Sequence, residues 1–449
     1  MTGVVRKKNR DKAMRTNIVH IGATELNYEI RKIVEVANRI AALSGKPILW
    51  ENIGDPVQKG QHLPDWMKDC IARAVRDDST YAYSPTRGLL RTREFLAERL
   101  NRRGGAQIQA DDILFFNGLG DAVSKIYGFL RREARVIGPS PAYPTHSSAE
   151  AAHSGYAPIT YRLVPENGWM PDMQELYNKV KYNEAIAGIM IINPDNPTGA
   201  VFPEGVIREI IDIARKFRLF IIADEIYINM TYGGATATHV SDVIGDVPAI
   251  SLKGISKEFP WPGSRCGWIE VYNHHSEPMF EKYVQSILNA KMLEVSSTTL
   301  PQAVIPEIMG DPRYDAWVAE RNSFYERRSR KLAEIFAGIP EVILNPPRGA
   351  FYASFVFQVP LNNRMNLRIP NGEIEKYVAG ITAEPIEPDR KFVYQLLAAH
   401  NICVVPLTGF VCGELQGFRC TLLEQDDEKF EQTYTSIAKA IQEFVHSVD

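Results

Sequence analysis

Lys257 is a residue whose type and setting predict covalent chemistry. It lies in SLKGISKEFPWPGSRCGW, residues 251–268, after the apolar run 249–254 and before Pro260 and Pro262. Prolines this close together interrupt helices and strands and predict a loop of defined conformation. Burial at the end of a strand lowers the pKa of a lysine, and a neutral amine can form a Schiff base with a carbonyl. The competing interpretation is an ordinary solvated charge in a loop.

Three further stretches place polar groups or glycines directly after apolar runs. Asp224 follows the apolar run LFIIA at 219–223. Burying a carboxylate there is unfavourable unless a cation or strong hydrogen-bond donors lie beside it. A ligand could supply them, but so could a role as a helix cap or a strand-end ion pair. The stretch NPDNPTG at 193–199 predicts a turn whose asparagines bind either backbone or a ligand. NGLGDA at 117–122 predicts a helix that begins at glycines, with free N–H groups suited to a phosphate.

The elements that must position these residues alternate along the chain. Strands are predicted from short apolar runs at 112–117, 134–139, 186–193, 219–224, 249–254 and 265–271, with helical patterns such as 120–133 and 204–218 between them. Near-continuous apolar strands separated by helices indicate an α/β fold with a mostly parallel sheet covered on both faces. Ligands of such sheets bind beyond the carboxyl ends of the strands. Gly118, Asn193, Asp224 and Lys257 all follow predicted strands, so we expect them at one edge.

The pattern changes after about residue 330 and predicts a second, smaller α+β domain. A helix near 330, a strand at 349–357, a loop at 358–390, and then a helix, two strands and a closing helix are expected. The predicted boundaries are a basic flexible tail at 1–16, an N-terminal segment at 17–63 that packs with the small domain, a large domain at 64–327 and a small domain at 328–449.

Composition and charge narrow the classes of protein. The 449 residues, 45% hydrophobic and 23% charged, are typical of a soluble globular protein. A net charge of -3 gives no reason to expect nucleic acid or an anionic membrane, and no apolar run approaches the ~18 residues of a membrane-spanning helix. The five cysteines are scattered without a metal-type CxxC pair, which predicts reduced thiols, no metal site and a cytoplasmic location.

Taken together, the motifs resemble those of one enzyme family. NGLGDA, PAYPTH, NPDNPTG, ADEIY and GISKEFPWPGSRCGW occur in the order of the class I/II aminotransferases, which have pyridoxal phosphate (PLP) fold type I. The resemblance covers about residue 50 to the C-terminus, and the combination of NPxNPTG, DExY and SK followed by an arginine is highly specific. It implies a large PLP-binding domain with a mostly parallel mixed sheet flanked by helices, a smaller α+β domain, and a homodimer that shares its active sites.

By this resemblance, several residues surround the ring of the cofactor. Lys257 matches the lysine that holds PLP as a Schiff base and then moves the substrate α-proton. Asp224 matches the partner of the pyridinium nitrogen, and Asn196 and Tyr227 match the donors to the ring oxygen. Tyr143 matches the aromatic residue that stacks on the ring.

The same resemblance implies contacts to the phosphate and to the substrate. The residues expected at the phosphate are Gly118, Leu119, Gly120, Ser256 and Arg265, with Tyr83 reaching it from the neighbouring subunit. Arg419 matches the arginine that clamps the substrate α-carboxylate, and Gly54 matches the glycine that lets the backbone approach it; Asn196 also faces the substrate.

The function implied is an aminotransferase that moves an amino group from an amino acid to a 2-oxo acid, 2-oxoglutarate being the expected acceptor, by a ping-pong mechanism. Another reaction on the same scaffold, such as amino-acid β-decarboxylation or C–S lysis, is the alternative because it would use the same cofactor residues. A PLP-binding transcriptional regulator would need a DNA-binding segment, which the chain does not supply. Arg87 and Arg348 are the candidates for a second arginine that would recognise a dicarboxylic substrate.

Some residues depart from the family pattern. Gly254 stands where a phosphate-binding serine is frequent, which is why Ser256 is expected at the phosphate. Trp261 and Cys266 are unusual, and residues 358–390 form a longer segment than relatives have. His146 is expected either behind Asp224 or on the surface. These departures surround the substrate pocket, so they leave specificity open.

Overall fold

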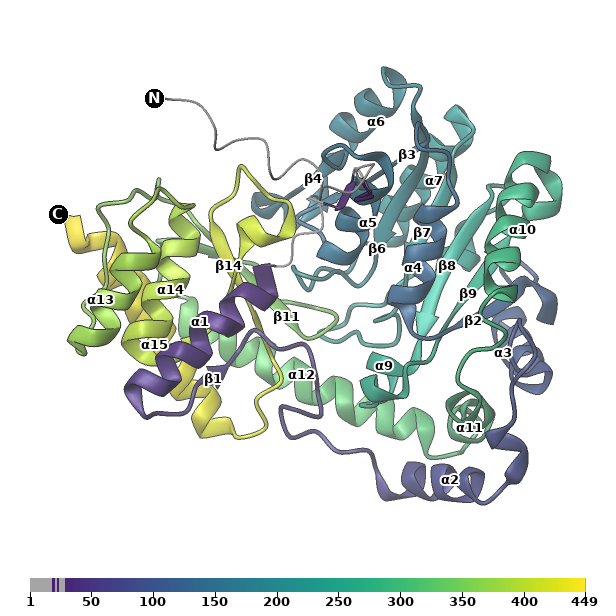
Figure 1. Ribbon diagram of the computed structural model, residues 1–449, viewed down its shortest axis with the longest axis horizontal. Coiled ribbons are helices and arrows are strands. Elements are labelled where there is room, and N and C mark those ends of the chain that lie inside the picture. The colour runs from purple at the N-terminus through teal and green to yellow at the C-terminus, as the bar shows by residue number, and fades with distance from the viewer. Residues whose placement is uncertain (1–17, 21, 24–28, 449) are drawn as a thin grey trace, which may run out of the picture.

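The chain folds into a larger and a smaller part, with the N-terminal helix lying on the smaller one (Figure 1). The computed structural model describes residues 18–20, 22, 23 and 29–448. The basic tail expected at 1–16 lies outside these residues. None of the helices in the described part is both long and apolar enough to cross a membrane.

An eight-stranded mixed sheet forms the centre of the larger part, with the strand order β2-β9-β8-β7-β6-β3-β4-β5. The strands are β2 (Ile113–Phe116), β3 (Arg135–Ser140), β4 (Thr160–Val164), β5 (Met170–Pro171), β6 (Ile186–Ile192), β7 (Phe220–Asp224), β8 (Ala249–Gly254) and β9 (Gly267–Tyr272). Strands β4, β3, β6, β7 and β8 run parallel, whereas β5 and β9 are antiparallel to their neighbours. The carboxyl ends of β6, β7 and β8 therefore meet at one edge.

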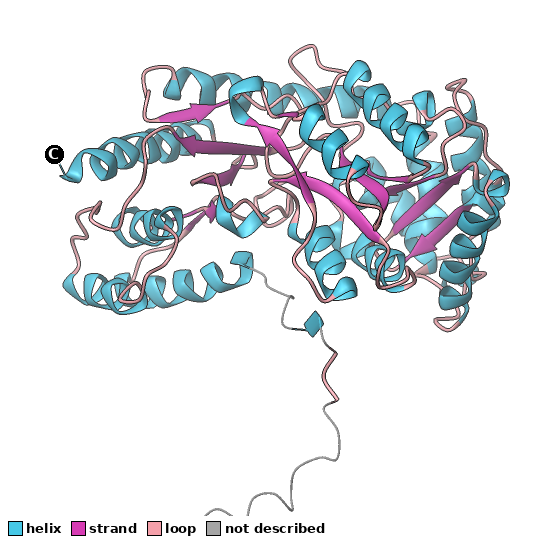
Figure 2. Ribbon diagram, turned by 90° about the horizontal axis from the view of Figure 1, so that it is seen from above, coloured by secondary structure: helices cyan, strands magenta, loops and turns pink. Residues whose placement is uncertain are grey.

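Helices cover both faces of this sheet, which explains why its strands are apolar throughout (Figure 2). In β7, Ile221 and Ala223 pack on one face while Phe220 and Ile222 pack on the other. The first face carries α2 (Asp65–Val75), α3 (Leu90–Asn101), α6 (Met173–Lys181), α7 (Glu204–Phe217), α8 (Val240–Val243) and α11 (Thr299–Met309); the second carries α4 (Leu119–Gly128), α5 (Pro144–Ser154) and α10 (Pro278–Met292).

The smaller part is built on a four-stranded antiparallel sheet with the order β10-β11-β14-β13. Its strands are β10 (Val342–Leu344), β11 (Tyr352–Phe357), β13 (Val405–Pro406) and β14 (Gly417–Thr421), and its helices are α1 (Glu29–Ser44), α12 (Tyr314–Phe336), α13 (Gly372–Ile381), α14 (Pro388–His400) and α15 (Asp427–Val445). Strand β1 (Leu49–Trp50) pairs with β12 (Ile402–Cys403), so the N-terminal segment is attached to this part before it reaches the large sheet.

The predicted fold class is confirmed: a mostly parallel mixed sheet flanked by helices, with a smaller α+β part. The loop expected at 358–390 contains α13. The residue before this helix, Asn371, caps it by accepting from two backbone N–H groups with its side chain. Helix α12 runs from the larger core, at Tyr314, into the smaller core, at Leu332. We propose that the boundary between the two domains falls within this helix, at 327/328.

Candidate functional site

Lys257 lies in the one-turn helix α9 (Ile255–Glu258), directly after β8 and not on the strand itself. Its Nζ donates a hydrogen bond of 2.5 Å to the carbonyl oxygen of Gly54, on the segment that follows β1. Burial lowers the pKa of Lys257 from its ordinary 10.5 to about 8; Asp55 opposes this shift, whereas Arg419 and Arg265 add to it. The neutral, nucleophilic amine is therefore far more abundant near neutral pH than in a solvated lysine.

Asp224 is the last residue of β7 and is buried. Its Oδ2 lies 2.9 Å from Nε2 of His146, a buried residue of α5, and its Oδ1 accepts from the backbone N–H of Ile226 at 3.1 Å. His146 thus lies against the Asp224 carboxylate rather than on the surface. These two donors hold the carboxylate at the sheet edge, where it can pair with a cationic ring nitrogen.

Arg419 is a buried cation whose partners are all neutral. Its Nη1 donates to the side-chain oxygen of Asn196 at 3.1 Å, and its Nη2 donates to the carbonyl of Asn52 at 2.6 Å. The guanidinium carbon lies 4.4 Å from the ring centre of Tyr352 and 5.0 Å from that of Phe410. Its Nε has no hydrogen-bond partner in the described part of the chain, and no carboxylate there pairs with the residue. Burial lowers the pKa of this guanidinium, and the electrostatic influence of Tyr352 and Tyr227 opposes that shift.

Aromatic side chains lie beside both Lys257 and Arg419: the Lys257 Nζ is 5.7 Å from the ring centre of Phe351, next to Tyr352 in the chain. The hydroxyl of Tyr227 donates to that of Tyr352 at 3.1 Å, and burial raises the pKa of both phenols. Tyr143, at the start of α5, is close enough to act electrostatically on both of these tyrosines. Tyr352 was not expected from the sequence; its signal was the alternating strand pattern at 349–357, which does not indicate which face meets a ligand.

Four of the residues expected at the phosphate, Gly118, Leu119, Gly120 and Arg265, lie at the start of α4. Gly118 precedes this helix with a φ of 86°, and a Cβ placed on it would collide with the guanidinium of Arg265. The N–H groups of Leu119 and Gly120 belong to the first helical turn, which has no intrahelical acceptors, and a Cβ on Gly120 would meet nothing within 4 Å. Helix start, arginine and open space form a cradle suited to a phosphate. Ser256 lies beside Lys257 in α9.

Some expected site residues lie elsewhere in the single chain. Tyr83 is 83% exposed and lines a surface cleft of about 540 Å³ together with Asn117. Arg87 and Arg348 donate to the backbone carbonyls of Asp111 and Gly233, at 2.6 and 2.8 Å. Among the described residues, the acceptors of these two arginines are backbone carbonyls away from Arg419.

One group of potential metal ligands lies at the amino end of β2. Donor atoms of Asp112, His274 and His275 lie within 4.8 Å of one another. His274 is already hydrogen-bonded to Asp112 at 2.8 Å and His275 to Glu281 at 2.8 Å. Because β2 is antiparallel to β9, this cluster is at the sheet edge away from Lys257 and takes no part in the candidate site.

The chain matches the family described as aminotransferase class I and II over residues 47–437. An uncharacterized aminotransferase of Methanocaldococcus jannaschii is 54% identical over 433 residues, which cover 96% of this chain and 100% of that protein. A glutamate-pyruvate aminotransferase of Escherichia coli is 29% identical over 329 residues, or 72% of this chain and 79% of that protein.

Solved structures agree with this match. An alanine aminotransferase from Pyrococcus furiosus superposes with a TM-score of 0.81 at 26% identity, covering 96% of this chain and 100% of that one. A tyrosine aminotransferase from Leishmania infantum shares the fold, with a TM-score of 0.78 at 19% identity and the same coverage of both chains.

Proposed function

Because the chain belongs to the class I and II aminotransferases, we propose that it transfers an amino group from an amino acid to a 2-oxo acid with pyridoxal 5′-phosphate as cofactor. Bound PLP supplies an aldehyde that condenses with amines and a ring that accepts electrons from the substrate Cα. Our proposal assigns Lys257 to the covalent attachment of the cofactor and to proton transfer at the substrate Cα.

The remaining cofactor assignments follow from the same sheet edge. Asp224, held by His146, pairs with the ring nitrogen, and Asn196 and Tyr227 bind the ring oxygen. Tyr143 stacks on the ring. The cradle of Gly118, Leu119, Gly120, Arg265 and Ser256 binds the phosphate. The lowered pKa of Lys257, the collision that a Cβ on Gly118 would cause and the open space at Gly120 support this fit.

The observation that carries the proposal is the uncompensated charge of Arg419. A fully desolvated guanidinium with only neutral partners is costly, and a substrate carboxylate would supply the missing charge. Arg419 contacts Asn52, and Gly54, two residues further along the same segment, accepts from Lys257. A carboxylate bound at Arg419 would therefore place the α-amino group toward Lys257. Binding a carboxylate next to a reactive amine is what an enzyme acting on amino acids requires.

We propose 2-oxoglutarate as acceptor and a small neutral amino acid, alanine first, as donor. Relatives named glutamate-pyruvate aminotransferase and alanine aminotransferase support this choice. Arg87 and Arg348 are both occupied by backbone carbonyls, which disfavours them as a second carboxylate clamp within the chain. The reaction is ping-pong: the oxo acid made from the donor leaves before the acceptor binds.

We further propose a homodimer in which Tyr83 reaches the phosphate of the partner's cofactor. Its high exposure beside the cleft at Asn117 leaves the phenol free to do so. The five cysteines are all buried as free thiols, which is compatible with the cytoplasmic location that we propose.

A substrate panel tests the function. The purified enzyme is incubated with single amino acids, with and without 2-oxoglutarate, and the oxo acid and ammonia are measured. We expect product only when 2-oxoglutarate is present; turnover without an oxo acid would instead identify a lyase or decarboxylase. Lys257→Ala should lose both activity and the absorbance band of the cofactor linked to lysine as a Schiff base, while Lys282→Ala, at an exposed position of α10, should keep both.

A further inference from the structure

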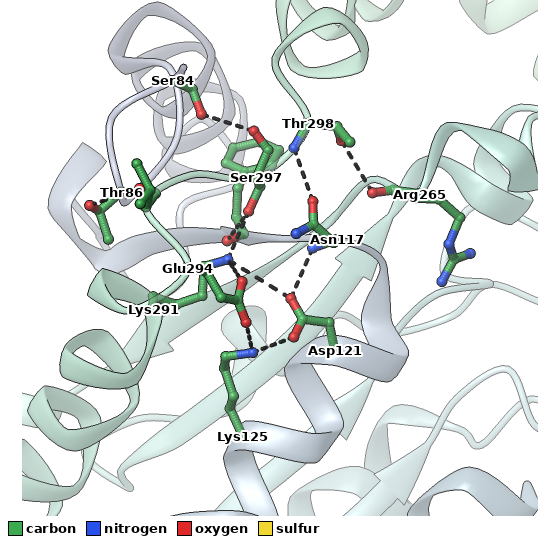
Figure 3. Close-up of polar contacts among 12 residues, drawn as sticks. Ser84, Thr86, Asn117, Asp121, Lys125, Arg265, Lys291, Glu294, Ser297 and Thr298 are labelled. Carbon is green, nitrogen blue, oxygen red and sulfur yellow. Dashed lines mark hydrogen bonds and ion pairs between the residues drawn. The ribbon is translucent and has the colours of Figure 1, made fainter.

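Four charged side chains lie beside the start of α4 and have no role in the proposed function. This quartet consists of Asp121 and Lys125 in α4, Lys291 near the end of α10, and Glu294 just after it (Figure 3). Lys125 forms ion pairs with both carboxylates. Lys291 Nζ lies 2.5 Å from Glu294 and 3.8 Å from Asp121. Two ammonium groups and two carboxylates give the quartet no net formal charge.

Lys291 is the member whose placement calls for an explanation. Its side chain is 0% exposed, and its Nζ also donates to the hydroxyl of Ser297 at 3.0 Å and lies 5.2 Å from the ring centre of Phe116. A buried ammonium is costly unless it is fully paired, and an apolar side chain would serve packing better. Burial opposes ionisation of Glu294, yet its hydrogen bonds from Lys125 and Lys291 lower its pKa.

The quartet is connected to the phosphate cradle by a chain of hydrogen bonds. Asp121 Oδ2 accepts from the backbone N–H of Asn117 at 3.0 Å, which fixes the residue before Gly118. The side-chain oxygen of Asn117 accepts from the backbone N–H of Thr298 at 3.0 Å. The hydroxyl of Thr298 donates to the carbonyl oxygen of Arg265 at 3.3 Å. Figure 3 shows this path from Lys291 and Glu294 through Asn117 to Arg265.

Lys291 anchors the other end of this path. Ser297, which accepts from Lys291, donates to the carbonyl oxygen of Phe115 at 2.9 Å, so the strand before the cradle is tied to the same ammonium. Residues 294–298 are thus held between α4 and the end of β2. Electrostatics favours the same role. The carboxylates of Asp121 and Glu294 would repel a phosphate dianion at the start of α4, and the two lysines balance their charge.

We propose that Lys291 is a positioning residue for the phosphate of the cofactor. It holds Asn117 and the backbone of Arg265 in the geometry of the cradle and, with Lys125, neutralises the carboxylates behind it. Lys291 does not touch the cofactor. The proposal rests on the proposed function, because it assumes that PLP binds at the start of α4.

The test compares two ligands that differ only in the phosphate. The dissociation constants of PLP and of pyridoxal are measured by titrating apoenzyme and following protein fluorescence. The proteins are the wild type, Lys291→Met, the charge-balanced Lys291→Met/Glu294→Gln, and the control Lys282→Met at an exposed position of the same helix. Thermal unfolding of each apoenzyme shows which variants fold.

We expect Lys291→Met to bind PLP at least about tenfold more weakly, about 1.4 kcal/mol, with pyridoxal binding unchanged. If that variant does not fold, the double variant is judged by the same criterion, since it leaves no unpaired charge. Unchanged PLP affinity, or an equal loss for both ligands, overturns the positioning role. Failure of the wild type to bind PLP would instead contradict the proposed function, so the two failures are distinguishable.

Discussion

Lys257 is surrounded by charges that act on its amine in opposite directions. Burial, Arg419 and Arg265 lower its pKa to about 8, while Asp55 favours the ammonium. Since Asp55 stabilises the charged form, Asp55→Asn should lower the pKa further. We therefore expect the rate at which apoenzyme captures PLP to rise with pH through about 8 in the wild type, and at lower pH in the variant.

Stopped-flow absorbance across a pH series measures this midpoint. Asparagine keeps an oxygen that can accept the bonds from the backbone N–H groups of Val57 and Gln58, so the turn is preserved. The control is Glu209→Gln, which also removes one carboxylate but on the exposed face of α7. It should leave the pH midpoint of PLP capture unchanged. A midpoint that moves upward in Asp55→Asn would contradict the assignment.

Among the residues proposed to contact the substrate, Arg419 should be the one at which a conservative substitution lowers activity most. Lysine keeps the charge but cannot donate to Asn196, to Asn52 and to a carboxylate at once. We expect Arg419→Lys to lower kcat/KM for the donor at least about thirtyfold, equivalent to about 2 kcal/mol, with PLP absorbance retained. Steady-state kinetics measures the change in kcat/KM. The control is Arg348→Gln, at a residue whose hydrogen-bond acceptor is a backbone carbonyl away from Arg419, and it should keep its activity toward alanine.

At the scale of elements, the segment after β1 must come very close to β11. A Cβ on Gly54 would collide with the hydroxyl of Tyr352, and the next atom of that side chain, Cζ, would be 3.2 Å away. Gly54→Ala should therefore displace this segment and its hydrogen bond to Lys257, with a loss of activity of about tenfold or more. Tyr352→Phe removes the colliding oxygen, so the double variant should recover part of that loss.

Kinetics of the two single variants and the double variant form the cycle that measures this coupling. Additive losses would show that Gly54 is required for a reason other than the space taken by Tyr352. The backbone of Gly54 lies outside the left-handed region, so alanine is excluded there by its neighbour and not by φ.

At the scale of the whole molecule, two neighbouring segments expose large apolar side chains. Leu293 is 87% exposed, and Tyr81, Tyr83, Met292 and Val295 are exposed with it. Thr86 donates to the carbonyl of Val295 at 3.2 Å, which joins the two segments. Such a patch fits the proposed dimer interface. Leu293→Lys should shift the enzyme toward monomer and weaken PLP binding, because Tyr83 could then not reach the partner's site.

Sedimentation velocity with and without PLP measures the shift. Tyr182→Lys replaces another large exposed side chain, 75% exposed and directly after α6 on another side of the larger part, and should leave the oligomeric state unchanged. A Leu293→Lys variant that sediments like the wild type would place the interface elsewhere.

Local patterns predicted the large sheet well because its strands are buried on both faces. All six strands expected from apolar runs are present, with ends shifted by at most a few residues, such as β9, which begins at Gly267 rather than at residue 265. The edge strand β5 and its neighbour β4 were not predicted, since β4 alternates buried and exposed residues and β5 is very short. Helix α13 was missed because the prolines and asparagines around it favoured a loop.

The sequence by itself determined which residues meet at the edge of the large sheet. Asp224 and Lys257 follow strands that run in the same direction, so their positions along the chain already imply a shared edge. Only the tertiary structure decided what faces them. Arg419 meets Asn196 across 223 residues of chain, and Lys291 reaches Asp121 from another helix. No local pattern encodes these contacts, because they depend on how the smaller part and α10 pack against the sheet.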